Sequence, residues 1–129
     1  MDRSRAVRLA RMTTLVRGMV VDIDLEPVKG SETGKVRPCV IVTNNRYNAR
    51  VPVIQVVPLT AWSEKKARIV TNVEISPSAA NGCTKRSVAD CLQTRPVDRH
   101  ERLVRTRGRI ADIDLENIDT ALKIVFNLD

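Results

Sequence analysis

The chain has 129 residues, 43% of them hydrophobic and 29% charged, which is enough for one domain with one core. Its net charge of +7 at pH 7 favours a polyanionic partner such as RNA, DNA or an acidic protein. Only Tyr47, Trp62 and Phe126 are aromatic, which argues against a site built on several stacking rings, and no apolar stretch approaches the roughly 20 residues of a membrane span.

Residues 1–16 are expected to form a basic extension, either a tail or a short helix, ahead of a single domain over residues 17–129. This extension contains arginines but no apolar segment of the kind found in secretory signals. The three cysteines, Cys39, Cys83 and Cys91, are an odd number without a CxxC pair. We interpret them as reduced core thiols of a cytoplasmic protein.

Five short strands are predicted in chain order. They are expected at residues 18–25, 38–43, 51–59, 69–75 and 86–92. Between the first two lies a segment with Pro27, Gly30 and Gly34, which predicts an exposed loop of the kind that often contains functional residues. The nearly continuous apolar run at 38–43 is typical of a strand buried on both faces.

The last segment has a helical period. Apolar residues recur at spacings of three and four residues, which predicts an amphipathic helix of about 14 residues with Asp112 or Asp114 as its N-cap. The residues on this apolar face are Leu115, Ile118, Ala121, Leu122 and Val125. The predicted fold class is therefore mainly β with α: a small curled antiparallel sheet or barrel followed by a C-terminal helix.

The sequence lacks the residues that several known mechanisms of phosphodiester cleavage require. A histidine-pair nuclease needs one imidazole as base and another as acid, and His100 is the only histidine. A two-metal site needs several convergent carboxylates, whereas only Asp22 and Asp24 share a strand face. Because there is also no P-loop, GxSxG or HExxH motif, we expect no metal or other cofactor and look to arginine, hydroxyl and amide groups.

An ordered series of short motifs resembles the MazF/PemK toxin family. The series begins with Arg17-Gly18, Asp24-Leu25, Pro27 and Gly30-Ser31-Glu32, and continues with Arg37-Pro38 through Asn44, Tyr47-Asn48, Val57 through Thr60, Ser87-Val88, Gln93, Arg95 and Asp98. Each piece alone would be weak, but their order and spacing over roughly residues 16–127 make the resemblance strong.

This resemblance implies a small SH3-like barrel of about five to seven strands with a C-terminal helix. It also implies a homodimeric toxin of a type II toxin-antitoxin system that cleaves single-stranded RNA sequence-selectively, without metal, through attack of the ribose 2′-hydroxyl. The expected partner is a MazE-like antitoxin with an acidic C-terminal segment that becomes ordered on binding.

The resemblance assigns the catalytic roles to Arg37 and Thr60. A guanidinium offers a planar set of donors to the negative charge that develops on a phosphoryl group, and a hydroxyl can add another hydrogen bond. Because the arginine pKa exceeds about 12, arginine suits charge stabilisation better than general base catalysis. The competing interpretation of Arg37 is a structural ion pair at the start of a strand. The expected RNA-binding residues are Lys29, Ser31, Glu32, Lys35, Asn44, Gln93 and Arg95.

Two positions depart from the family pattern. Leu92 replaces an acidic residue before the glutamine, and Asp22 replaces a frequent tryptophan, which we expect to alter the dimer surface or the groove. Two alternatives therefore stay open. One is a gyrase-binding toxin of the CcdB type without nuclease activity, and the other is a degenerate relative that only binds nucleic acid or antitoxin.

Overall fold

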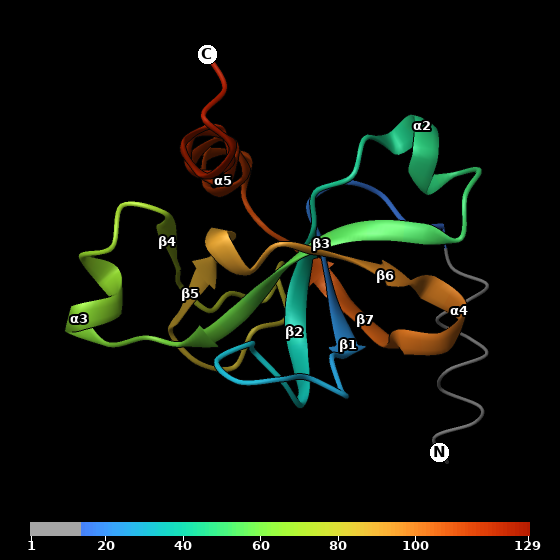
Figure 1. Ribbon diagram of the computed structural model, residues 1–129, viewed down its shortest axis with the longest axis horizontal. Coiled ribbons are helices and arrows are strands. Elements are labelled where there is room, and N and C mark those ends of the chain that lie inside the picture. The colour runs from blue at the N-terminus through green and yellow to red at the C-terminus, as the bar shows by residue number, and fades with distance from the viewer. Residues whose placement is uncertain (1–13) are drawn as a thin grey trace.

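The computed structural model describes residues 14–129, which form one curled antiparallel sheet and a C-terminal helix (Figure 1). The strands are β1 (Met19–Asp24), β2 (Val36–Ile41), β3 (Val53–Ala61), β4 (Asn72–Ile75), β5 (Ser87–Asp90), β6 (Arg95–Asp98) and β7 (Leu103–Arg109). The helical elements are α2 (Asn45–Asn48), α3 (Glu64–Ala67), the 3-10 turn η1 (Cys91–Gln93), α4 (Arg99–Arg102) and α5 (Asp112–Phe126). The mainly β fold with a C-terminal helix is thus confirmed.

The long strand β3 gives the sheet its curl. One edge of β3 pairs with β2, while the other edge pairs first with β6 and then with β5, so that the sheet divides along this strand. The strand order is β4-β5-β3-β2-β1-β7 with β6 beside β3. Within the described residues the end strands β4 and β7 are not paired with each other, so the sheet stays open and does not close into the expected barrel.

Two apolar clusters fill the two faces of the sheet. Successive residues of a strand point to opposite faces, and in β1 Val21 belongs to the first cluster and Val20 to the second. The same division occurs in β2 between Cys39 and Val40. This double burial explains why these strands have nearly continuous apolar sequences. Leu15, ahead of the predicted domain start, is also buried in the first cluster, whereas residues 1–13 of the extension lie outside the described residues.

Helix α5 covers the second cluster with the apolar face predicted for it. Ile118 and Ala121 are buried, and the helix packs mainly against β4. The predicted N-cap is wrong: Ala111 occupies that position without a side-chain hydrogen bond, and Asp112 and Asp114 lie in the first turn. Carboxylates in the first turn still interact favourably with the positive end of the helix dipole.

Two strands, β6 and β7, escaped the sequence prediction. Both lie in an arginine-rich stretch that contains few apolar residues, so their period-two pattern is weak. The three cysteines are free and buried, as predicted for core thiols. Across the described residues, no helix is both long and apolar enough to cross a membrane.

Candidate active site

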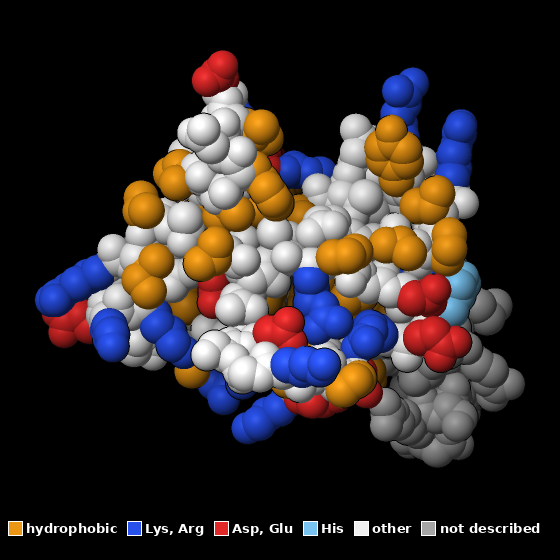
Figure 2. Space-filling view, viewed as in Figure 1, with side chains coloured by type: hydrophobic (Ala, Val, Ile, Leu, Met, Phe, Trp, Pro, Cys, Tyr) orange, Lys and Arg blue, Asp and Glu red, His pale blue; other side chains and the backbone are white. Residues whose placement is uncertain are grey.

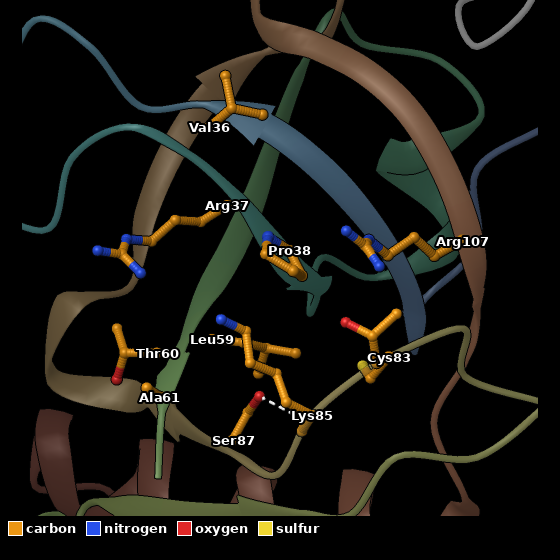
Figure 3. Close-up of a pocket in the computed structure, with 11 residues that line it drawn as sticks. Val36, Arg37, Pro38, Leu59, Thr60, Ala61, Cys83, Lys85, Ser87 and Arg107 are labelled. Atoms are coloured by element: carbon orange, nitrogen blue, oxygen red, sulfur yellow. Dashed lines mark hydrogen bonds between the residues drawn. The ribbon is translucent and has the colours of Figure 1, made fainter.

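The pairing of β2 with β3 brings the two predicted catalytic residues together. Cys39 pairs with Pro58 and Ile41 with Val56. Continuing this antiparallel register by two residues places Arg37 opposite Thr60 at the end of the pair. Both side chains lie on the same side of a shared cavity (Figure 3). The pairing of the two strands thus brings together residues that are 23 positions apart in the sequence. A motif search cannot detect this proximity.

The cavity that contains Arg37 and Thr60 has a volume of about 240 Å³. The lining residues are Val36, Arg37, Pro38, Leu59, Thr60, Ala61, Cys83, Thr84, Lys85, Ser87 and Arg107. Three of them are cationic and none is acidic. A concave site lined by one sign of charge concentrates counter-charges, so this cavity is suited to an anionic group.

Arg37 is held by the loop that precedes its strand. Its Nε donates a hydrogen bond to the carbonyl oxygen of Gly34 at 3.0 Å, and the side chain is half-buried. Within residues 14–129 it forms no ion pair with a carboxylate, so the competing interpretation as a structural salt bridge finds no support. The Oγ1 of Thr60 accepts from Nζ of Lys66 at 3.5 Å. The guanidinium thus retains donors for a ligand.

Four of the predicted RNA-binding residues line a neighbouring cavity of about 560 Å³. These residues are Lys29, Glu32, Gln93 and Arg95, and Leu92 lines the same cavity. The Oε1 of Gln93 accepts from the backbone nitrogen of Thr33 at 3.3 Å, which ties the β1–β2 loop to η1. Nη1 of Arg95 donates to the carbonyl oxygen of Leu25 at 3.0 Å. The loop and the turn after β5 therefore form one surface.

The remaining three predicted residues line neither of these two cavities. Ser31 and Lys35 are exposed on the β1–β2 loop. Lys35 has a φ of 67°, and its backbone nitrogen donates to Oε1 of Glu26 at 2.7 Å. Asn44 caps α2 through a hydrogen bond from the backbone nitrogen of Arg46 at 2.8 Å. Figure 2 shows basic side chains around the β1–β2 loop and α3 on this face of the molecule.

Sequence reasoning missed two cations of the smaller cavity, Lys85 and Arg107. Arg105 and Arg107 are two residues apart, a strand signal that could have placed both on one face of β7. Lys85 lies in the loop before β5, where the sequence carries no comparable signal.

Two other groups that often take part in catalysis, the Cys83 thiol and the His100 imidazole, are poorly placed or poorly ionised for it here. Burial is the main cause that raises the pKa of the Cys83 thiol, with Asp22 also raising it and Arg107 opposing them. A raised pKa keeps this cavity-lining thiol protonated and weakly nucleophilic. His100 is exposed in α4 and lines none of the cavities described here. Over residues 14–129 there is no group of three metal-ligating side chains that could hold an ion.

Fold and site together define a class: a small curled β-sheet protein with a C-terminal helix and a cationic cavity that contains an arginine beside a hydroxyl. Comparison with known proteins identifies the family. Residues 16–126 match the family model described as PemK-like, MazF-like toxin of type II toxin-antitoxin system. The chain belongs to this family.

Individual relatives agree with that membership. The chain is 33% identical over 117 residues to Endoribonuclease MazF9 of Mycobacterium tuberculosis (strain ATCC 25618 / H37Rv), an alignment that covers 87% of this chain and 96% of the relative. Its fold is similar to the crystal structure of MazF from Deinococcus radiodurans, with a TM-score of 0.74, 17% identity and coverage of 90% and 99%. It is also similar to an endoribonuclease in complex with its cognate antitoxin from a mycobacterial species, with a TM-score of 0.71, 23% identity and coverage of 89% and 97%.

Proposed function

We propose that this chain is the toxin of a type II toxin-antitoxin pair and that it acts in the cytoplasm as a metal-independent, sequence-selective endoribonuclease on single-stranded RNA. The observation that carries the proposal is the placement of Arg37 and Thr60 in one cationic cavity. Family membership and the 33% identical endoribonuclease support it independently of the geometry.

The proposed reaction is transesterification within the RNA. The ribose 2′-oxygen attacks the adjacent phosphorus, the bond from phosphorus to the 5′-oxygen breaks, and the products end in a 2′,3′-cyclic phosphate and a 5′-hydroxyl. Negative charge develops on the phosphoryl oxygens during the attack. The Arg37 guanidinium stabilises that charge, and the Thr60 hydroxyl donates a further hydrogen bond to the same group.

The larger cavity is the proposed binding surface for the neighbouring nucleotides. Lys29 and Arg95 supply positive charge for phosphates, and Glu32 and Gln93 supply hydrogen-bonding groups for base edges. Ser31 and Lys35 are proposed to contact the RNA from the exposed part of the same loop. Bases of single-stranded RNA are accessible to such polar loop groups because they are not paired in a duplex.

The proposed assembly is a homodimer that an antitoxin inhibits. Beside α5 lies a cleft of about 680 Å³ lined in part by Leu122, Phe126 and Leu128, and the last two are exposed. Exposed apolar surface of this kind is characteristic of protein interfaces. The solved mycobacterial relative is a complex with its antitoxin, and the charge of +7 favours an acidic antitoxin segment.

The decisive experiment incubates the purified full chain with a long RNA in excess EDTA. Cleavage that leaves 2′,3′-cyclic phosphate ends is the expected result. Arg37→Ala should abolish cleavage and leave the circular dichroism spectrum and the oligomeric state unchanged, because the side chain is half-buried and, within residues 14–129, its one hydrogen bond is to Gly34. Retained cleavage in this variant would eliminate the catalytic role. Intact RNA together with stalled gyrase would instead favour the gyrase-binding toxin, and intact RNA without either effect the degenerate module.

A further inference from the structure

Arg107 is a second arginine in the cavity of Arg37 and Thr60, and the resemblance gives it no role. It comes from β7, whereas Arg37 comes from β2. Figure 3 shows its side chain projecting toward the cavity from the side opposite Arg37, with Pro38 between the two arginines in this view. The two arginines thus approach the same space from different strands.

A buried carboxylate fixes the position of Arg107. The Asp22 side chain is 8% exposed, and its Oδ1 accepts from Nε of Arg107 at 2.6 Å. Its Oδ2 accepts from Nε of Arg105, also at 2.6 Å. Arg105 pairs with Asp22 across β1 and β7, and Arg107 lies two residues further along β7 on the same face. One carboxylate therefore anchors two guanidinium groups.

The anchored guanidinium keeps donors for a ligand. Arg107 uses Nε for Asp22 and Nη1 for the carbonyl oxygen of Gly82 at 3.0 Å. Its Nη2 has no hydrogen-bond partner among the described residues, although the side chain is only 17% exposed. An arginine has five N–H donors in a fixed plane, so a largely buried and pre-oriented group with free donors is suited to bind an oxyanion.

The charge balance favours an anion in the same place. Asp22 does not line the cavity, and it is shared between two arginines, so this triad keeps one positive charge. Neither Arg37 nor Lys85 forms an ion pair within residues 14–129. The volume of about 240 Å³ is below the 300 Å³ at which drug-sized ligand sites begin, and it suits a phosphate with part of its nucleotide.

We propose that Arg107 is a second phosphate-binding arginine, which contacts a non-bridging phosphate oxygen of RNA held in the cavity. The inference rests on the proposed function, because RNA is taken as the ligand. Arg107 would then bind RNA together with Arg37 and Thr60. Asp22 would position Arg107 for this contact, in addition to joining β1 to β7.

Arg105 provides a matched control for the test. It binds the same carboxylate, but its side chain is 57% exposed and it does not line the cavity. The probe is a mixed-sequence, fully 2′-O-methylated single-stranded RNA, which lacks the attacking hydroxyl. Its dissociation constant is measured against NaCl concentration for the wild type, Arg107→Gln and Arg105→Gln, with thermal unfolding to verify folding.

Each phosphate contact contributes about 0.7 to the slope of log K against log salt for a single strand. Arg107→Gln should therefore reduce the slope by about 0.7 and weaken binding several-fold at low salt, while Arg105→Gln should retain the wild-type slope. An unchanged slope for Arg107→Gln, or the same reduction in both variants, would overturn the inference. If Arg107→Gln does not fold, Arg107→Lys is compared with Arg105→Lys, and equal affinities would overturn it.

Failure of this inference and failure of the proposed function give different results. Cleavage of a long RNA by the wild type in EDTA tests only the function. Cleavage with an unaffected Arg107→Gln slope removes only the role of Arg107. Specific loss of slope in Arg107→Gln without any cleavage by the wild type supports the phosphate contact and removes the nuclease assignment.

Discussion

Replacing Asp22 by asparagine should destabilise the fold strongly. The two carboxylate oxygens accept one charge-assisted hydrogen bond each, at 2.6 Å, from Arg105 and Arg107. Hydrogen bonds to charged groups contribute about 1.5–3 kcal/mol each. An asparagine of the same shape offers one accepting oxygen, and its NH₂ group would face the second guanidinium. The variant therefore loses at least one such bond and the neutralising charge.

The loss is partly offset because burying a carboxylate is itself unfavourable and asparagine relieves that penalty. We therefore expect the free energy of unfolding to fall by about 2–3 kcal/mol. For a chain of this size about 1 kcal/mol corresponds to roughly 4 °C in Tm, so the midpoint should fall by about 8–12 °C. Urea and thermal unfolding of the full chain measure both quantities, at one fixed protein concentration because dimerisation would shift them.

Asp119→Asn is the matched control for Asp22→Asn. Asp119 pairs with Arg17 between α5 and the segment before β1, and the two side chains are 39% and 28% exposed. Exposed ion pairs contribute up to about 1 kcal/mol, so this identical substitution should lower the free energy of unfolding by less than that. Equal losses in the two variants, or a more stable Asp22→Asn protein, would refute the claim that the buried carboxylate organises β1 and β7.

Two further predictions concern the cavity hydroxyl and the core thiols. Thr60→Ala should lower the rate of RNA cleavage about 10- to 100-fold, as expected for the loss of one hydrogen bond to a charged group, while Thr60→Ser should retain most of it because the hydroxyl remains; equal rates in both variants would contradict this role. Burial, with Asp90 adding to it, raises the pKa of Cys91 from 9.0 to about 12. The thiol therefore ionises at a lower pH in the unfolded chain than in the folded chain, so that the free energy of unfolding falls as the pH rises above 9. At pH 10 the loss from this thiol is about 1.4 kcal/mol. Urea unfolding at pH 8 and pH 10 should therefore show a smaller pH-dependent loss for Cys91→Ala than for the wild type, and identical losses would count against it.

The strands and the helix in which buried residues recur at regular spacing were predictable from the sequence. Strands β1, β2 and β3 have apolar residues on one or both faces, and α5 repeats apolar residues every three to four positions, so each has a clear pattern. Strand β7 differs because hydrogen bonds to β1 hold it in the sheet while arginines occupy alternate positions. Only the tertiary structure shows that Arg105 and Arg107 bind a buried carboxylate.

The site was predictable only in part, and for a related reason. Motif order placed Arg37 and Thr60 in matching positions, and the register of β2 with β3 explains how they meet. The motif series does not include two other residues that line the cavity. These are Arg107 from β7 and Lys85 from the loop before β5. These groups reach the cavity through long-range pairing, and such pairing is not encoded in local spacing.

Asp22 shows how a departure from the family pattern should be interpreted. From the sequence it was expected to change the dimer surface or the groove, and its side chain lies beneath the surface, with only 8% exposed. A carboxylate at that depth requires cationic partners, and β7 supplies two of them at the same face. Because one of these partners lines the cavity, the acidic residue in β1 and the arginines in β7 form one unit. In a relative with an apolar residue at this position, no buried carboxylate would stabilise the two arginines of β7. We therefore expect such a relative to lack at least one of them and to have a less cationic cavity.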